Sequence, residues 1–235
     1  MTTPVAVVTG AAAGIGAATC DLLEASGWEV VAVDREPCAR QGALQVDLAD
    51  PDATAVSLAS LPRVDGLVNN AAVQLFRPIE ETSISDWDTV IDTNLRSAFV
   101  CMAALQDRLA AVSGAVVNVA SVHAHVTSLG TAAYASSKGG LLSFTRSAAL
   151  ELARSGVRVN SVSPGAVDTA ALQSGLSRQG GGVERIASRT PLRRVGRPDE
   201  IAQAILFLLD PARSGFITGQ DLVVDGGALA MLGTE

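Results

Sequence analysis

This sequence of 235 residues is poor in lysine, tyrosine and aromatic side chains in general. It contains one lysine, Lys138, and one tyrosine, Tyr134, and aromatic residues make up only 3% of it. So few aromatic side chains exclude a stacking platform for single-stranded nucleic acid. The net charge of −7 argues against a protein that binds the phosphate backbone, because such proteins need clustered cations. We therefore expect no nucleic-acid partner.

Cysteine, histidine and long apolar runs are also scarce. The three cysteines, Cys20, Cys38 and Cys101, show no C-x-x-C spacing, which is typical of unpaired thiols in a reducing compartment. The two histidines, His123 and His125, lack metal-ligand spacing, so we expect no metal site. No run of about 18 apolar residues and no basic leader precede the first strand. These absences predict a cytoplasmic protein without a membrane partner.

Hydrophobic residues make up 48% of the chain and charged residues 17%, which is enough for a sizeable core. Short Val-rich runs alternate with helical patterns along the whole length. The runs predict strands at 5–8, 29–33, 43–46, 66–68, 115–120, 157–162 and 221–224. Helices are expected at 15–25, 134–155 and 198–209 and from about Ser85, which would cap its helix with Asp86 and Asp88 near the positive end. This alternation predicts one α/β domain over 1–235, with a parallel sheet covered on both faces.

One segment departs from this alternation. From Asp168 to Arg197 the chain is rich in Ser, Gly and Arg, and it carries three consecutive glycines at 180–182. Its length and composition predict a loop that serves as a substrate lid over 168–197.

A glycine-rich turn connects the first strand to the first helix. Thr9-Gly10-Ala11-Ala12-Ala13-Gly14-Ile15-Gly16 has the spacing G-x-x-x-G-x-G rather than G-x-G-x-x-G. Glycines at this point allow backbone N–H groups to approach a pyrophosphate at the helix N-terminus. A structural turn without a ligand remains an alternative for this motif taken alone.

Asp34 ends the second predicted strand, 18 residues after Gly16. A carboxylate there can accept hydrogen bonds from both ribose hydroxyls of an adenosine and repels a 2′-phosphate. Ala13, before Gly14, supplies no cation for such a phosphate, whereas the guanidinium of Arg35 is able to reach one. Taken together, Asp34 and Ala13 favour NAD over NADP despite the neighbouring Arg35.

Tyr134 and Lys138 stand four positions apart, which places both on one face of a helix. A tyrosine hydroxyl ordinarily has a pKa near ~10, and an adjacent ammonium lowers this pKa by favouring the phenolate. The pair therefore predicts a general acid/base made from a phenol. Ser121, at the end of the strand predicted at 115–120, is placed to hold the substrate oxygen beside Tyr134.

These motifs, in this order, resemble those of the short-chain dehydrogenase/reductase family over nearly the full chain. The matching residues are Thr9-Gly10 with Gly14-Ile15-Gly16, Asn69-Asn70-Ala71-Ala72, Asn94, Ser121, Tyr134 with Lys138, Pro164-Gly165-Ala166-Val167-Asp168-Thr169 and Val224-Asp225-Gly226-Gly227. The resemblance implies a Rossmann-like, doubly wound fold with a seven-stranded parallel sheet. It also implies a homo-oligomer, usually a tetramer.

The resemblance implies a role for each matching residue. Tyr134 is the acid/base, Ser121 orients the carbonyl or alcohol, Lys138 binds the nicotinamide ribose and lowers the pKa of the tyrosine, and Asn94 holds a water in a proton relay. The implied cofactor contacts are Gly10, Ala13, Gly14, Ile15, Gly16, Asp34, Arg35, Asp47, Leu48, Asn70, Pro164, Gly165, Val167 and Thr169.

Two features depart from the family pattern. Ala72 stands where the family usually has Gly, which narrows the floor of the cofactor site without abolishing binding. Only 12 residues separate Asp34 from Asp47, so the helix expected between these strands is shortened or absent.

The sequence therefore predicts hydride transfer between NAD(H) and a small-molecule secondary alcohol or ketone. The alternatives are an NADPH-dependent 3-oxoacyl thioester reductase, a nonenzymatic nucleotide-binding scaffold, and a relative of the epimerases and dehydratases. Gln74 and His123 are candidate contacts to a hydroxylated substrate such as a sugar, polyol or cyclic diol, although His123 and His125 also fit a solvated loop. Arg189, Arg193 and Arg194 fit either an anion site or a solvated surface.

Overall fold

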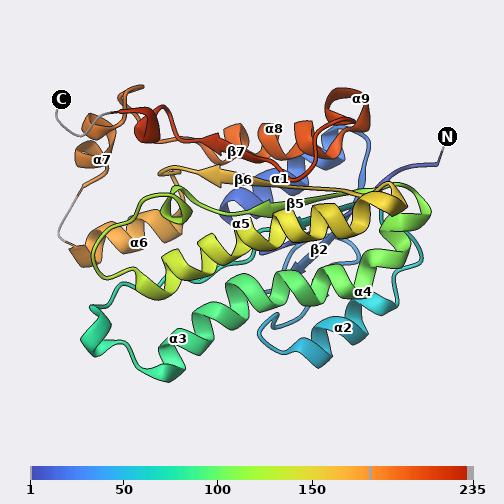
Figure 1. Cartoon of the computed structure of the whole chain (residues 1–235), viewed down its shortest axis with the longest axis horizontal. Helices are drawn as coiled ribbons and strands as arrows, with labels where there is room; N and C mark the ends of the chain where they lie inside the picture. Colours follow the sequence, from blue (N-terminus) through green and yellow to red (C-terminus); the bar gives the residue numbers. More distant parts are fainter. Residues whose placement is uncertain (1, 180–181, 232–235) are drawn as a thin grey trace.

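The computed structural model describes residues 2–179 and 182–231 and is built on a sheet of seven strands (Figure 1). The strands lie in the order β3-β2-β1-β4-β5-β6-β7, and every adjacent pair is parallel. Their bounds are β1 Val5–Thr9, β2 Glu29–Asp34, β3 Leu44–Gln45, β4 Gly66–Asn69, β5 Ala115–Val119, β6 Arg158–Pro164 and β7 Asp221–Val224. The predicted α/β fold with a seven-stranded parallel sheet is confirmed.

Helices cover both faces of the sheet, because its central strands are apolar on both sides. α1 (Gly14–Ala25) and α8 (Pro198–Leu209) pack on one face, where Ala6 and Val8 of β1 point. α2 (Pro51–Ala59), α4 (Ser97–Ala111) and α5 (Ala132–Leu152) lie on the other face, where Val7 points. A short helix, α9 (Pro211–Ser214), follows α8. None of the helices in the described part of the chain has the length and apolar character that a membrane span requires.

The strand order places one crevice at the carboxyl end of the sheet. The chain passes from β1 outward to β2 and β3, then returns to the other side of β1 to form β4. Loops that leave β1 and β4 therefore diverge, and ligands of open α/β sheets bind at such a point. The glycine-rich turn follows β1, and the Asn69-Asn70 motif follows β4, so both motifs lie at this crevice.

The helix expected from Ser85 begins earlier and is capped by a different serine. α3 (Ile84–Ile91) is capped by Ser83, whose Oγ accepts from the N–H of Asp86 at 3.1 Å, while the Asp86 carboxylate accepts from the N–H of Ser83. The prediction that Ser85 caps the helix was wrong because this reciprocal capping box satisfies two orphan N–H groups at once. A π-helical turn, Asp92–Arg96, joins α3 to α4.

The predictions for two connecting segments, residues 35–43 and 168–197, had different outcomes. Residues 35–43, between β2 and β3, contain no helix, as the short spacing predicted. The segment 168–197 is not the continuous loop that its composition predicted, since it carries α6 (Ala170–Gln179) and α7 (Val183–Arg189). Gly180 and Gly181, in the predicted centre of this lid, lie outside the described residues.

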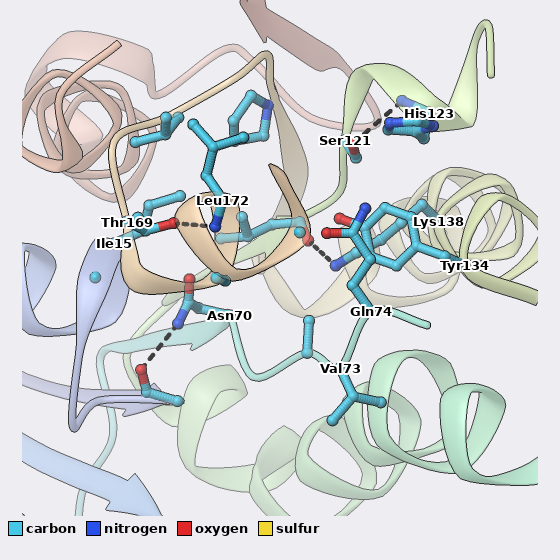
Figure 2. A pocket seen from close by; sticks show the side chains of 18 of the residues that line it. Ile15, Asn70, Val73, Gln74, Ser121, His123, Tyr134, Lys138, Thr169 and Leu172 are labelled. Atoms are coloured by element: carbon cyan, nitrogen blue, oxygen red, sulfur yellow. Dashed lines mark hydrogen bonds between the residues drawn. The ribbon is translucent and has the colours of Figure 1, made fainter. Parts of the chain in front are cut away.

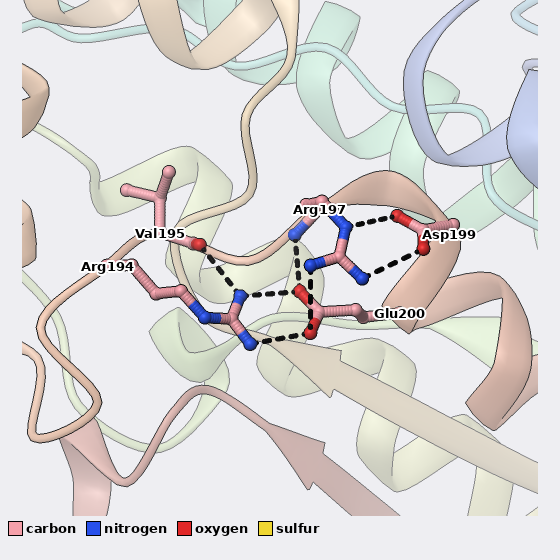
Figure 3. Close-up of polar contacts among 5 residues, drawn as sticks. All are labelled: Arg194, Val195, Arg197, Asp199 and Glu200. Atoms are coloured by element: carbon pink, nitrogen blue, oxygen red, sulfur yellow. Dashed lines mark hydrogen bonds and ion pairs between the residues drawn. The ribbon is translucent and has the colours of Figure 1, made fainter.

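The segment after α7 is tied to the body of the protein by ion pairs and backbone contacts. Arg194 donates from both terminal nitrogens to the carboxylate of Glu200, and Arg197 binds Asp199 at 3.0 Å (Figure 3). Gly196 forms a parallel bridge with Val167 just beyond β6. The segment 168–197 is therefore anchored at its C-terminal end beside the crevice.

Gly16 offers a test of the packing between the glycine-rich turn and α1. A Cβ built on Gly16 lies 2.0 Å from the carbonyl oxygen of Gly10, so Gly16→Ala has to displace backbone. We expect it to lower the free energy of unfolding by about 3 kcal/mol. The matched control is Gly139→Ala in α5, where an added Cβ meets nothing within 4 Å and should stabilise the helix by up to ~1 kcal/mol. Equal denaturation midpoints for the two variants contradict this packing.

Candidate active site

A cavity of about 800 Å³ opens at the carboxyl ends of the strands and collects nearly all the predicted site residues. The two predicted residues that do not line the cavity, Gly16 and Asn94, lie behind its wall. The predicted residues that line it are Gly10, Ala13, Gly14, Ile15, Asp34, Arg35, Asp47, Leu48, Asn70, Gln74, Ser121, His123, Tyr134, Lys138, Pro164, Gly165, Val167 and Thr169.

The glycine-rich turn forms the floor of one half of the cavity. Gly14 adopts a φ of +56°, which L side chains rarely adopt, and an added Cβ there would lie 3.2 Å from Cγ2 of Thr169. Asn70 holds the turn from the other side, because its Nδ2 donates to the carbonyl oxygens of Thr9 and Gly10 at 2.9 and 3.1 Å. The backbone therefore leaves a cradle that side chains would fill.

Asp34 reaches the same floor from the end of β2. Its Oδ2 accepts from the N–H of Ala12 at 2.9 Å, and its Oδ1 accepts from the N–H of Glu36 at 3.0 Å. The neighbouring Arg35 lies 3.6 Å from the carboxylate of Glu36, and both of these side chains are exposed. The carboxylate of Asp34 is thus fixed at the cavity, whereas the guanidinium of Arg35 is engaged at its rim.

Lys138 is almost fully buried, with 2% of its surface exposed. Its Nζ donates to the carbonyl oxygen of Val119, at the end of β5, over 2.6 Å. Burial lowers the pKa of this ammonium from 10.5 to about 8 because the charged form loses its hydration. One hydrogen bond therefore joins α5 to the end of the strand that leads into Ser121.

Tyr134 lies one helical turn before Lys138, and its phenol is buried near the side chain of Ser121. Burial raises the pKa of its phenol, and the nearby hydroxyl of Ser121 offsets only part of this rise. The prediction of a lowered pKa is wrong for this structure, in which Nζ of Lys138 lies 5.8 Å from the centre of the tyrosine ring. Figure 2 shows Ser121, Tyr134 and Lys138 together on one side of the cavity.

Asn94 lies in the π-helical turn between α3 and α4, and 2% of its surface is exposed. Its Oδ1 accepts from the N–H of Val73 at 2.8 Å, and its Nδ2 donates to the Val73 carbonyl and to Oγ of Ser137. π-turns are frequent at functional sites because they re-aim one residue of a helix. Here the side chain clamps the segment after β4 to α5, directly behind Tyr134 and Lys138.

The two histidines lie in different surroundings. His123 lines the cavity, and its ring meets that of Tyr134 edge to face, with 5.6 Å between centroids. His125 pairs with Asp221 of β7 at 2.8 Å. The structure therefore brings His123 to the site and engages His125 with the edge of the sheet.

One wall of the cavity comes from α7 and the residue that follows it, within the predicted lid segment, although the sequence predicted no helix there and only Arg189 was named. Arg185, Ile186, Arg189 and Thr190 line it, and their spacing of i, i+1, i+4 and i+5 was the signal for a helical face. Of the three arginines proposed as an anion site, only Arg189 lines the cavity. Arg193 donates to the carbonyl oxygen of Ser188, and Arg194 binds Glu200.

The donor set of the cavity fits a nicotinamide dinucleotide. The cradle at Gly14 leaves room for a pyrophosphate at the N-terminus of α1, where backbone N–H groups favour negative charge. The carboxylate of Asp34 faces the adenosine side, and Lys138 and Thr169 line the opposite end of the same cavity. No cluster of His, Cys, Asp or Glu suited to a metal is present among the residues described.

Comparison with known proteins identifies the family to which the chain belongs. The family model described as enoyl-(acyl carrier protein) reductase matches residues 10–228. The chain belongs to the short-chain dehydrogenase/reductase family. Members of this family use NAD(P), and the chain is accordingly an oxidoreductase that acts on alcohols or ketones.

Two curated relatives and one solved structure illustrate the similarity. The chain is 39% identical to cis-4-hydroxycyclohexanecarboxylate dehydrogenase of Sinomonas cyclohexanicum, over 97% of both chains. It is 35% identical to cyclopentanol dehydrogenase of Comamonas sp., covering 96% of this chain and 97% of the relative. The ligand-free aldohexose dehydrogenase of Thermoplasma acidophilum superposes with a TM-score of 0.94 at 27% identity, covering 99% of this chain and 96% of that one.

The buried ammonium of Lys138 makes the stability of the protein depend on pH. Between pH 8 and 10.5 an unfolded lysine is protonated, while the folded one has begun to lose its proton. The unfolded state binds more protons in this pH range. Burial of the charged lysine therefore lowers the free energy of unfolding by its full amount below pH 8, and this loss is relieved as the pH rises. The stability advantage of Lys138→Met over the wild type should therefore shrink by about 3 kcal/mol from pH 8 to 10.5.

Chemical denaturation of both proteins across this range measures the difference. Tyrosine and cysteine titrations occur in both proteins and largely cancel. A difference between variant and wild type that stays constant with pH contradicts the burial of a titrating lysine.

Proposed function

We propose that this protein oxidises a secondary alcohol to the ketone with NAD, and that Tyr134 is the general acid/base. The observation that carries this proposal is the junction of Ser121, Tyr134 and Lys138 in the cavity that also holds Asp34 and the glycine-rich turn. When bound, the nicotinamide supplies the hydride acceptor or donor. The residues of the chain supply position, proton transfer and the exclusion of water.

Ser121 and Tyr134 define where the substrate oxygen sits. Oγ of Ser121 accepts from the N–H of His123 at 3.1 Å, which fixes the hydroxyl beside the phenol. In oxidation, Tyr134 takes the proton of the substrate hydroxyl, and in reduction it returns a proton to the carbonyl oxygen. The raised pKa of Tyr134 keeps the phenol protonated at neutral pH, so oxidation of the alcohol requires a nearby cation that favours the phenolate.

Lys138 and Asn94 support the tyrosine from behind. The ammonium of Lys138 holds the ribose side of the cofactor and offsets the cost of forming the phenolate when the alcohol is oxidised. Both groups of the Asn94 side chain are engaged with Val73 and Ser137. Asn94 is therefore assigned to the support of this wall, and a relay water would bind to its backbone rather than to its amide.

The preference for NAD rests on the carboxylate of Asp34. Its two oxygens are anchored by backbone N–H groups, so the charge cannot swing away from a 2′-phosphate. Arg35, the cation next to Asp34 in the chain, lies against Glu36 at the surface. Val167 and Thr169 complete the opposite end, where they bind the carboxamide of the nicotinamide.

A cyclic alcohol is the substrate class that the relatives favour. The names of the two curated relatives describe dehydrogenases of ring alcohols, and this cavity combines apolar residues such as Phe76 and Leu172 with Ser121 and Tyr134. α6 packs over the part of the cavity proposed for the cyclic substrate, because a Cβ on Gly175 would lie 3.1 Å from the side-chain ring of Phe76. The segment 168–197 thus serves as the substrate lid, while the tetramer and the cytoplasmic location stay predictions from the sequence.

Removal of the phenol tests the assignment of Tyr134. Tyr134→Phe should lower kcat for cyclohexanol oxidation by about 10²- to 10⁴-fold, because the proton acceptor is lost. NADH binding, followed by its fluorescence, should stay within about threefold of the wild type, since the ring remains in place. Turnover retained by this variant would remove Tyr134 from the reaction.

The cofactor preference is tested at Asp34. Wild-type kcat/KM should be higher with NAD than with NADP, and Asp34→Asn should reduce this ratio by about tenfold or more through loss of the repelling charge. Glu36→Gln is the matched control, because it neutralises a neighbouring carboxylate that faces Arg35 instead. A wild-type preference for NADP, with reduction of a 3-oxoacyl thioester, would replace this proposal with the thioester reductase.

A further inference from the structure

The imidazole of His123 is the first member of a row of hydrogen bonds at the edge of the substrate cavity. Its Nδ1 lies 3.0 Å from Oγ1 of Thr127. Oγ1 of Thr127 lies 2.8 Å from Oγ1 of Thr131, and the Thr131 hydroxyl donates to the carbonyl oxygen of Ser128 at 2.7 Å. Thr131 is 1% exposed, so water does not compete for its hydroxyl.

Counting protons along this row fixes the tautomer of His123. A carbonyl oxygen only accepts, so the single proton of the Thr131 hydroxyl points to Ser128. Thr131 must then accept from Thr127, which uses the single proton of that hydroxyl. Thr127 can therefore only accept from His123, and Nδ1 of the imidazole carries a proton.

The other ring nitrogen of His123 is a hydrogen-bond acceptor. Burial lowers the pKa of the imidazole, which keeps the ring neutral at pH 7. In a neutral ring with a proton on Nδ1, Nε2 has a free lone pair. Within the described part of the chain, Nε2 has no hydrogen-bond partner.

His123 lies directly beside the position of the reacting oxygen. Its backbone N–H binds Oγ of Ser121, and its ring meets that of Tyr134 edge to face. Figure 2 shows the ring next to Ser121, with Gln74 projecting into the same cavity. A group that reaches Nε2 must therefore belong to the part of the substrate next to its reacting carbon.

We propose that Nε2 of His123 accepts a hydrogen bond from a second hydroxyl of the substrate, on the carbon adjacent to the one that is oxidised. This inference rests on the proposed function, because it assigns a substrate class to the same site. The preferred substrates are 1,2-diols, and each turnover converts one diol and one NAD to a hydroxyketone, one NADH and one proton. An ether oxygen in the same place has no proton to offer and meets the lone pair unfavourably.

Three ring alcohols separate this role from general packing. Cis-1,2-cyclohexanediol offers the donor, 2-methoxycyclohexanol places an oxygen without a proton at the same carbon, and cyclohexanol has neither. The wild type should show kcat/KM at least about threefold higher for the diol than for the methoxy compound. In His123→Phe this ratio should fall to about one, because the acceptor is replaced by an apolar ring.

Thr127→Val tests whether the hydroxyl row sets the acceptor. Without the oxygen of Thr127, the proton is no longer held on Nδ1, so we expect the diol-to-methoxy ratio to fall towards one as well. Thr89→Val, at an exposed position of α3 whose hydroxyl bonds to the Ser85 carbonyl, is the matched control and should keep the wild-type ratio. An unchanged ratio in His123→Phe would overturn the proposal.

The tautomer can be measured without turnover because the chain has only two histidines. In His125→Asn protein, ¹⁵N NMR should show a protonated Nδ1 and an unprotonated Nε2, and the Nε2 resonance should move when the diol, but not the methoxy compound, is added with NADH. A protonated Nε2, or no shift with the diol, overturns the inference. If no alcohol is oxidised with either cofactor, the proposed function fails instead, and the NMR result still decides the role of His123.

Discussion

The hydrogen bond from Lys138 to the carbonyl oxygen of Val119 determines how the active-site residues lie relative to one another. It joins the N-terminal half of α5 to the last residue of β5, so the helix cannot slide or rotate without exposing a buried ammonium. Tyr134, one turn earlier on α5, is thereby held over Ser121, two residues beyond Val119. Asn94 closes the assembly from α3 and α4, through its bonds to Val73 and Ser137.

The same arrangement explains why the two halves of the cavity can change independently. The half proposed for the dinucleotide is built largely from backbone, namely the glycine-rich turn, which Asn70 and the anchored carboxylate of Asp34 hold in place. The half proposed for the substrate is lined by side chains of the segment after Ser121 and of α6 and α7. The side chains of this second half take no part in the bond between Lys138 and Val119, so we expect substitutions there to leave that bond in place.

Much of the fold could be predicted from the sequence, because buried parallel strands leave a strong apolar signal. Pro198 and Leu209 bound α8 as predicted, and β7 spans Asp221–Val224 as predicted. α6 and α7 were missed because Ser, Gly and Arg favour loops locally, whereas packing of α6 against Phe76 favours a helix. Ser83 and Ser85 are equally good caps by composition, and only the reciprocal bond with Asp86 distinguishes them.

The residues of the candidate site could be listed from their motifs, but their states could not. Nothing in a Tyr-x-x-x-Lys spacing indicates that burial raises the pKa of Tyr134 in the absence of ligands or lowers that of Lys138 to about 8. The tautomer of His123 depends on Thr127 and Thr131, whose hydroxyls have no signature in the sequence. Such properties follow from distances between side chains, and only the structure provides them.

Because Lys138 is the only lysine and lies almost fully inside the protein, the surface offers no ε-amino group to amine-reactive chemistry. Reagents that acylate, cross-link or immobilise proteins through lysine will find no such group on the outside. A small reagent that enters the cavity meets a lysine whose low pKa leaves a sizeable neutral, nucleophilic fraction near neutral pH. Covalent labelling of this chain through its ε-amine would therefore report on access to the active site alone.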